Sequence, residues 1–353
     1  MRVLEVITGG EAGGAQRHLA DLVRGLAAMG DHILIAHGGG TWLDGVVPVP
    51  TAYLREIRRR PDPLQDTRAV ARLCGLVDAF QPDVIHGHSS KGGFLARLVG
   101  RLRGRPVVFT AHGFVLLDPT RSASSRMVFR WLEAWAARQS AAVIAVSARD
   151  RDLAAAMGAR RSVLIENAVE VPERPWERPG GDPPRVGFLG RFSREKGFEV
   201  LVSALSRPGE SLELRVAGDG PLAERYRDQV RAAQIAHAFV GWQDSPEDFL
   251  RAVDVLVIPS WKEGLPYTLL DALALGVPTL VTDVGGMGDV VRELDPDLVV
   301  PPGRPAELRA GIAHALGLSS DFTNRARALV GTRFSMDAMV ERTREVLRVA
   351  ARA

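Results

Sequence analysis

The chain has 353 residues, of which 46% are hydrophobic and 25% are charged. This composition excludes a disordered chain, and the length exceeds what one hydrophobic core usually holds, so we expect two globular domains. Lysine and arginine number 45 against 42 acidic residues, a net charge of +3, and the single cysteine, Cys74, excludes an internal disulfide framework. These features favour a reducing compartment, the cytosol.

The positive charge lies in the first half of the sequence. Residues 1–170 contain 22 lysines and arginines against 16 acidic residues, a net of +6, and the rest contains 23 against 26, a net of −3. A basic region of this kind is either a solvated face or a contact for anionic lipid or a phosphate-bearing substrate. No stretch of about eighteen apolar residues occurs and residues 1–10 lack the pattern of an export signal, so we expect any membrane contact to be peripheral.

The first half alternates short β-rich segments with amphipathic ones. Residues 15–29 have the periodicity of a helix, and strands are expected at 2–8, 33–36, 84–86, 107–110 and 142–146. Strands that alternate with helices form parallel sheets. The pattern predicts a doubly wound α/β domain over residues 1–170.

A proline-rich segment at residues 171–184 cannot continue a helix or a central strand, and we interpret it as a linker. The alternation then restarts, with strands expected at 185–189, 212–217, 238–240, 255–258 and 279–282, and with helices that end near 205 or begin near 222 and 266. This predicts a second doubly wound domain over residues 185–335. Residues 336–353 are expected to form a closing helix that packs back on the first domain.

Ligands of doubly wound sheets bind at the carboxyl ends of the strands, so the loops there are the candidate sites. Gly13 and Gly14 lie in a glycine-rich turn that opens a helix, which suits a phosphate or a sugar, although it would also suit a tight turn with positive φ. His86, His88 and His112 follow two other strands. They lack the compact spacing of zinc ligands, so we expect no metal site, and His112 is the candidate for substrate contact.

In the second domain, Arg191 and Lys196 lie in a glycine-bounded turn after the first strand, and two cations there suit a diphosphate. The chain contains only three lysines, Lys91, Lys196 and Lys262, against 42 arginines, and all three lie in candidate loops. Lysine is a compact point charge, whereas arginine is a planar fork. The usage therefore favours a functional role for these lysines.

A strand, a loop and a helix meet within residues 259–273. Pro266 suits the first turn of that helix, whose N–H groups would bind an anion. Glu263 would lie at the phosphate end and Asp271 about 7 Å along the helix, at about 1.5 Å per residue. Two carboxylates on either side of a diphosphate can hold the hydroxyls of two sugars. The alternative is a loop carboxylate and a solvated helix charge.

Together these segments resemble glycosyltransferase family 4, the retaining glycosyltransferases of the GT-B fold, over nearly the whole chain. The matching segments are 259–271, 276–278, 285–291, 190–191 with 196–197, 167–170 and 13–14. The resemblance implies two doubly wound Rossmann-like domains that face each other across a cleft. The N-terminal domain would bind the acceptor, and the C-terminal domain the nucleotide sugar.

The resemblance also implies roles for residues of the second domain. Arg191 and Lys196, with the backbone at Gly264 and Leu265, would hold the donor diphosphate. Glu263 would be a catalytic residue that binds hydroxyls of the transferred sugar near the anomeric carbon.

Further roles carry over to other positions. Asp271 would bind the ribose, although the family has glutamate there and the shorter arm changes the geometry. His112 would be catalytic, beside the donor sugar, and His88, Lys91 and Asn167 would contact the acceptor or the sugar.

The implied activity is an EC 2.4 transfer of a hexose or N-acetylhexosamine, with retained configuration, from a nucleoside-diphosphate sugar to an acceptor hydroxyl. A UDP-sugar is favoured, no cofactor or metal is expected, and no nucleic acid is involved. The resemblance is greatest to bacterial transferases of cell-surface glycan or glycolipid synthesis. A lipid-linked acceptor at the inner face of the cell membrane fits the basic first half of the chain. It also fits an apolar stripe at helical spacing, formed by Val128, Trp131, Leu132 and Trp135. The alternative is that this stripe is part of the buried core.

Three alternatives remain open at the level of the sequence. A soluble natural product would replace the lipid-linked acceptor. A GT-B-fold epimerase would bind the same donor without transfer, and a non-catalytic nucleotide-sugar-binding protein is kept open by Asp271. The signature around Glu263 argues against the epimerase.

Overall fold

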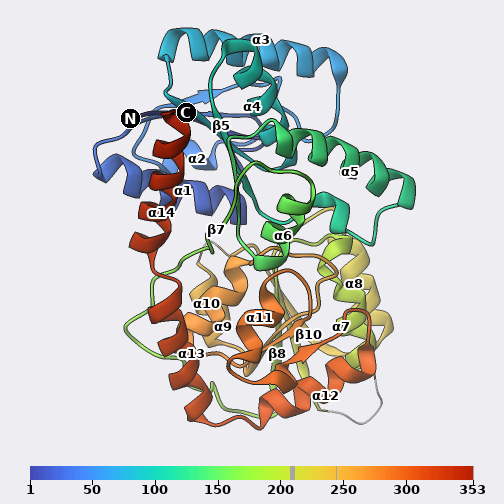
Figure 1. Ribbon diagram of the computed structural model, residues 1–353. Helices are drawn as coiled ribbons and strands as arrows, with labels where there is room; N and C mark the ends of the chain where they lie inside the picture. Colours follow the sequence, from blue (N-terminus) through green and yellow to red (C-terminus); the bar gives the residue numbers. More distant parts are fainter. Residues whose placement is uncertain (207–210, 244, 353) are drawn as a thin grey trace. The chain divides into compact units, whose positions relative to one another are not determined.

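A computed structural model describes residues 1–206, 211–243 and 245–352 (Figure 1). The chain divides into two compact units. The first unit comprises Met1–Leu117, Ala123–Asn167 and the chain from Met336 onward, and the second comprises Asp118–Ser122 and Ala168–Ser335. The chain therefore leaves the first unit near Asn167 and returns to it at its C-terminal end.

The first unit is built on a parallel sheet of seven strands in the order β3-β2-β1-β4-β5-β6-β7. The strands are β1 (Arg2–Ile7), β2 (His32–His37), β3 (Thr51–Tyr53), β4 (Val84–His88), β5 (Val107–Ala111), β6 (Ala142–Ala145) and β7 (Ser162–Leu164). The central strands β4, β5 and β6 are buried along their whole length. Both faces of such a sheet are covered, which is why buried residues do not alternate with exposed ones along these strands.

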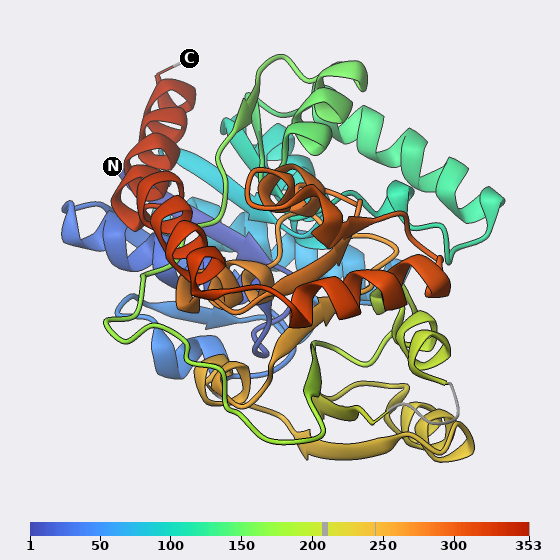
Figure 2. The same ribbon diagram turned by 90° about the horizontal axis from the view of Figure 1, so that it is seen from below.

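Helices connect the strands of the first unit. They are α1 (Gly14–Ala28), α2 (Trp42–Val46), α3 (Pro63–Phe80), α4 (Ser90–Arg103), α5 (Ala123–Arg138), α6 (Ala148–Ala156) and the short η1 (Val115–Leu117). The C-terminal helix α14 (Met336–Ala351) lies beside α1 in both views (Figures 1 and 2). Its Arg344 guanidinium donates to the Asp31 carboxylate at 2.7 Å. Gly25 of α1 makes room for Val340, because a Cβ at Gly25 would lie 2.6 Å from the valine Cγ1.

The second unit contains a parallel sheet of six strands in the order β10-β9-β8-β11-β12-β13. The strands are β8 (Arg185–Leu189), β9 (Glu213–Ala217), β10 (Ala236–Gly241), β11 (Val255–Ile258), β12 (Thr279–Thr282) and β13 (Val299–Val300). The helices are η2 (Arg194–Lys196), α7 (Phe198–Leu205), α8 (Ala223–Ala232), α9 (Pro246–Arg251), α10 (Tyr267–Leu275), α11 (Met287–Arg292), η3 (Pro296–Leu298), α12 (Pro305–Leu316) and α13 (Ser320–Arg333).

The predicted pair of doubly wound sheets is confirmed, and the predicted strands 185–189, 255–258 and 279–282 have the observed bounds. The strands β3, β7 and β13 were not predicted. Each has only two or three residues and lies at a sheet edge, so it contains too little apolar sequence to give a pattern. The predicted strand 84–86 extends to His88, which places both of its histidines within the sheet.

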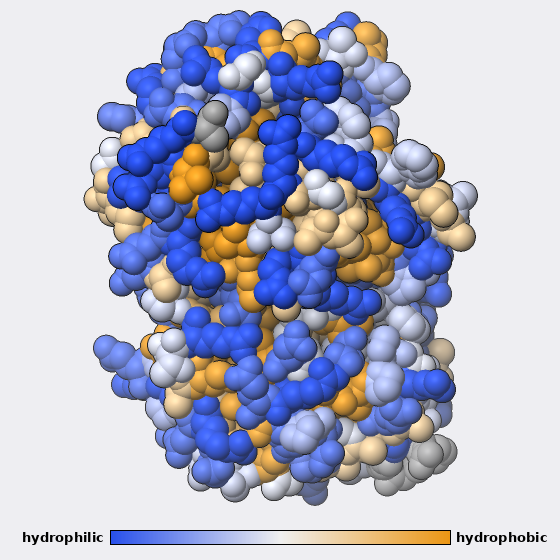
Figure 3. All heavy atoms as spheres, in the orientation of Figure 1, coloured by the Kyte–Doolittle hydropathy of each residue, from blue (hydrophilic) through white to orange (hydrophobic). Residues whose placement is uncertain are grey.

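No helix among the described residues combines the length and the apolar character needed to cross a membrane. Hydrophilic side chains cover most of the face drawn in Figure 3, and apolar side chains show between them.

Candidate functional site

The loop after β8 is held against the end of β11 by a glycine. Gly197 follows η2 with φ +65°, and a Cβ on it would lie 2.0 Å from the carbonyl oxygen of Pro259. Only glycine takes this left-handed conformation without strain and allows so close an approach of two backbones. The turn that contains Arg191 and Lys196 is thereby positioned beside the loop that contains Glu263.

Lys196 and Glu263 meet at the carboxyl ends of β8 and β11. The Lys196 ammonium donates to Glu263 Oε1 at 2.6 Å, and the Ser260 hydroxyl donates to the same oxygen at 2.8 Å. The two side chains are 25% and 11% exposed, so water still reaches the pair. The sequence assigned separate roles to the cation and the carboxylate, and the structure brings them into direct contact.

The start of α10 lies next to this pair in the sequence and is held by backbone contacts. The N–H of Gly286 donates to the carbonyl of Gly264 at 2.7 Å, and Gly285 adopts φ +60° with its Cβ position 2.3 Å from that carbonyl oxygen. Pro266 precedes the helix, which begins at Tyr267, one residue later than predicted. Helix N-termini bind anions through their N–H groups, so this end of α10 suits a phosphate.

The other residues predicted to bind the sugar donor lie in the loop after β8 and in or just before α10. Arg191 is exposed in the loop after β8, and Leu265 is buried, so its backbone rather than its side chain would face a ligand. Asp271 is half-buried and is the fifth residue of α10.

The glycine loop before α1 does not form the tight turn with positive φ that the sequence left open. Gly13 has φ 173°, an extended conformation that any residue adopts, and α1 begins at Gly14. The reading of Gly13 as a positive-φ turn is therefore wrong. Both glycines are exposed at the start of α1.

Buried polar side chains lie within the adjacent strands β1 and β4. Glu5 is fully buried; its carboxylate accepts from His88 Nε2 at 2.8 Å and lies 3.0 Å from His86 Nδ1. His86 Nε2 also bonds to the Thr110 hydroxyl at 2.8 Å. Burial raises the pKa of Glu5, but the charge of His86 and the hydrogen bonds from both histidines outweigh it and lower the pKa to about 2. Glu5 is therefore a buried carboxylate at neutral pH.

His88 also lies close to two further imidazoles, those of His112 and His18. The Nδ1 of His88 lies 3.3 Å from the Nε2 of His112, and the Nδ1 of His18 lies 3.0 Å from the Oδ1 of Asn167. Burial, and then the charge of His86, lower the pKa of His88 to about 4, while burial lowers the pKa of His18 to about 3. Both rings are neutral at pH 7.

Sequence reasoning missed Glu5 and His18. The available signal was the one charged residue inside the first apolar strand, since a buried carboxylate requires partners. Of the predicted contact residues, His88 is fully buried and Asn167 is 4% exposed. Lys91 pairs with Asp66 at 2.6 Å and donates to the Arg60 carbonyl at 2.7 Å. Their contact with an acceptor or sugar stays a prediction.

Two doubly wound units, each with a parallel sheet, define a protein of the GT-B fold class. The structure superposes on that of Anabaena Alr3699/HepE in complex with UDP-glucose with a TM-score of 0.81 at 20% identity, over 99% of this chain and 100% of that one. This likeness concerns the fold.

The sequence comparisons give the family. Residues 13–168 match the glycosyl transferase 4-like domain, and residues 183–317 match the glycosyl transferases group 1 domain. The 2-deoxystreptamine N-acetyl-D-glucosaminyltransferase of Streptomyces fradiae is 31% identical over 78% of this chain and 69% of its own. The UDP-Gal:alpha-D-GlcNAc-diphosphoundecaprenol alpha-1,3-galactosyltransferase of Escherichia coli is 26% identical over 65% of each chain. The chain belongs to glycosyltransferase family 4 and is a glycosyltransferase of class EC 2.4.

Proposed function

We propose that the protein transfers a hexose or N-acetylhexosamine from a UDP-sugar to an acceptor hydroxyl with retention of configuration. The observation that carries the proposal is the contact of Lys196 with Glu263 at 2.6 Å beside the start of α10. In this proposal the cation binds the diphosphate, and the carboxylate beside it binds the sugar. The Escherichia coli relative is named for UDP-Gal, and the Anabaena structure holds UDP-glucose, which favours uridine.

In this proposal the leaving diphosphate gains negative charge, which Arg191, Lys196 and the N–H groups at the start of α10 stabilise. The acceptor oxygen bonds to the anomeric carbon on the face from which the diphosphate departs, and the acceptor proton passes to a departing phosphate oxygen. Glu263 binds hydroxyls of the sugar, and Asp271 binds the ribose. These cations neutralise the diphosphate, so no metal is needed at that point.

A donor screen tests the proposal. Thermal shift and hydrolysis are measured with UDP-, GDP-, dTDP- and ADP-sugars for the wild type, Glu263→Ala and Lys196→Ala. We expect stabilisation by a UDP-sugar with slow UDP release, and a loss of both in the two variants, of the order of 10²-fold or more in rate. Glu307→Ala, an exposed carboxylate of α12, is the matched control and should retain both. Absence of binding to every donor would refute the transferase proposal.

For the acceptor, we propose a lipid-linked sugar reached from an anionic membrane surface. The predicted stripe on α5 is exposed: Val128 is 57%, Trp131 is 75% and Leu132 is 43% accessible, whereas Trp135 packs on Phe94 with 5.5 Å between ring centroids. The alternative of a fully buried stripe is thus wrong. An apolar helix face in a basic half-chain suits the interface of anionic lipid.

Sedimentation with vesicles tests the membrane contact. The wild type should bind vesicles that contain phosphatidylglycerol at low salt and bind phosphatidylcholine vesicles much less. A double variant, Trp131→Ser with Leu132→Ser, should release it, whereas Trp42→Ser, an exposed tryptophan of α2, should not. A wild type that ignores anionic vesicles would favour the second candidate, a soluble aminocyclitol acceptor, because the Streptomyces fradiae relative is named for 2-deoxystreptamine.

A further inference from the structure

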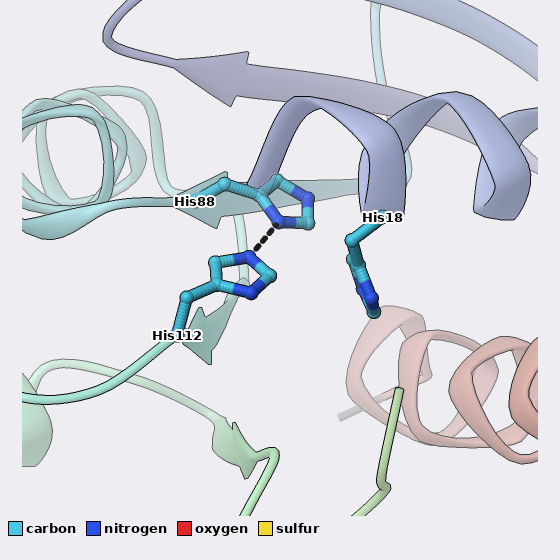
Figure 4. Close-up of side chains that lie close together, drawn as sticks. All are labelled: His18, His88 and His112. Carbon is cyan, nitrogen blue, oxygen red and sulfur yellow. Dashed lines mark hydrogen bonds between the residues drawn. The ribbon is translucent and has the colours of Figure 1, made fainter. Parts of the chain in front are cut away.

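Hydrogen bonds in the first unit determine which ring nitrogen carries the proton in three neighbouring histidines. His88 lies at the end of β4, His112 comes just after β5, and His18 lies on α1; their rings are close together (Figure 4). A neutral imidazole has one N–H donor and one lone pair, so the partner of one nitrogen decides the role of the other. The proton positions can therefore be followed from ring to ring.

The buried carboxylate of Glu5 decides the first ring. Its low pKa keeps it charged at neutral pH, and a charged carboxylate only accepts hydrogen bonds. Because it lies 2.8 Å from His88 Nε2, that nitrogen is the donor. Burial, and then the charge of His86, lower the pKa of His88 to about 4, so the ring is neutral at pH 7 and its Nδ1 has the lone pair. Glu5 thus makes His88 an acceptor on its other side.

His18 presents a second acceptor nitrogen. Its Nδ1 donates to the side-chain oxygen of Asn167 at 3.0 Å, and burial lowers its pKa to about 3, so the lone pair of the neutral ring is on Nε2. That Nε2 is buried and has no other hydrogen-bond partner. The ring meets that of His112 edge to face, with 4.9 Å between the centroids. One nitrogen from each of the three rings lies within 4.8 Å of the other two. Two lone pairs therefore lie beside His112.

His112 supplies the proton that these lone pairs require. Its Nε2 lies 3.3 Å from His88 Nδ1, and because Nδ1 of His88 accepts, Nε2 of His112 donates. Burial lowers the pKa of His112 well below its usual range, so the ring is neutral and its lone pair is on Nδ1. Within the part of the chain that the structure describes, no protein group bonds to this Nδ1, and the residue is partly exposed. The open position of His112 is therefore a hydrogen-bond acceptor.

We propose that Glu5 is a positioning residue that, through His88, holds His112 as a hydrogen-bond acceptor for a hydroxyl of the transferred sugar. Glu5 is fully buried, so it acts through the imidazoles and not by contact with substrate. The fixed Nδ1 lone pair accepts from a hydroxyl and cannot donate to a group that only accepts. The contact with the sugar rests on the transfer proposed above, whereas the proton positions do not depend on it.

Glu5 has a second contact that does not involve His112. Its carboxylate also lies 3.0 Å from His86 Nδ1, and His86 Nε2 bonds to the Thr110 hydroxyl at 2.8 Å. A purely structural role of Glu5 would be to hold this branch inside the sheet. The experiment must therefore separate the branch to Thr110 from the branch to His112.

Nuclear magnetic resonance of the full chain with ¹⁵N-labelled histidine tests the proton positions, because protonated and unprotonated ring nitrogens give distinct signals. The signals of His112 are assigned by their loss in His112→Asn. We expect the wild type to hold His112 as the Nε2–H form. Glu5→Leu, an apolar replacement in an apolar strand, should lose this single form. An Nδ1–H form in the wild type, or an unchanged Nε2–H form in a folded Glu5→Leu protein, would overturn the proposal.

Two variants serve as controls. Thr110→Val removes the hydroxyl at the end of the other branch and should leave the form of His112 unchanged. Glu56→Gln removes the charge of another buried carboxylate of the same unit, one that pairs with Arg55, and should also leave it unchanged. A change of His112 in either control equal to that in Glu5→Leu would refute the branch through His88.

A double-mutant cycle on kcat/KM for the donor tests the role in the reaction. Glu5→Leu should lower kcat/KM by about 10-fold, the order expected for one lost hydrogen bond, in the wild-type background. In the His112→Ala background the same change should have no further effect, whereas a structural role would give the same loss in both. If Glu5→Leu does not fold, Glu5→Gln, which keeps the size and removes the charge, takes its place. The resonance measurement uses no sugar donor, so its failure and the failure of the proposed transfer are distinct results.

Discussion

At the scale of single residues, buried charges in the first unit occur with partners. Glu5 is held by two histidines, and Asp31 is held by the N-terminal ammonium at 3.0 Å and by Arg344 at 2.7 Å. A buried carboxylate without such partners would be protonated or would destabilise the fold. The pairs therefore make the stability of this unit depend on pH.

Asp31 gives a prediction for acid unfolding. Burial raises its pKa, but hydrogen bonds from Arg344 and the N-terminal amine, with their charges, outweigh burial and lower the pKa in the folded state. The stabilisation is present above the unfolded pKa of about 3.9 and is lost as pH falls through the lower folded value. Urea unfolding at pH 7 and pH 3 should show a smaller acid loss of the free energy of unfolding in Asp31→Asn than in the wild type. Asp152→Asn, an exposed change that retains Asp31, should lose as much as the wild type; equal losses in all three proteins would contradict the argument.

At the scale of elements, the donor loops of the second unit depend on backbone approaches that side chains would prevent. Gly197 and Gly285 adopt positive φ. At each position a Cβ would clash with a carbonyl oxygen of the neighbouring loop. In this chain, glycine at both positions lets the two loops touch.

Gly197→Ala tests this element. The left-handed conformation costs a residue with a Cβ about 1–2 kcal/mol, and the clash with the Pro259 carbonyl adds to it. We expect a lower midpoint of urea unfolding and weaker donor binding in the thermal-shift assay. Gly45→Ala in α2, where a Cβ meets no atom within 4 Å, is the control and should keep both properties. A Gly197→Ala protein as stable as the control would show that the loops can separate without cost.

At the scale of the whole molecule, the chain crosses between its two units and ends in the first. Helix α14 buries five apolar side chains there, at Met339, Val340, Val346, Leu347 and Ala350. At about 1.5–3 kcal/mol for a fully buried large side chain, this contact contributes several kcal/mol to the first unit.

A chain shortened to end at Ser335 tests this contribution. Hydrogen exchange followed by mass spectrometry should show lost protection in α1 and in β4 to β6, which α14 contacts, and unchanged protection in β8 to β12. Arg344→Ala should show a weaker loss at the same positions, because it removes only the hydrogen bonds of Arg344 to the Asp31 carboxylate and the Met29 carbonyl. Protection that falls equally in both units would contradict the assignment of α14 to the first.

The amino-acid sequence by itself determined the two doubly wound sheets and placed Lys196, Glu263 and His112 in loops after strands, because hydrophobic periodicity and the loops after strands are local features. The family was indicated by the resemblance of its motifs, such as residues 259–271. Only the tertiary structure decided that Lys196 and Glu263 touch, that the α5 stripe is exposed, and that Glu5, His18, His88 and His112 meet. Parallel strands adjacent in a sheet are joined by long crossovers, so residues that face one another are separated by tens of residues in the chain. Spacing along the sequence therefore cannot reveal such contacts.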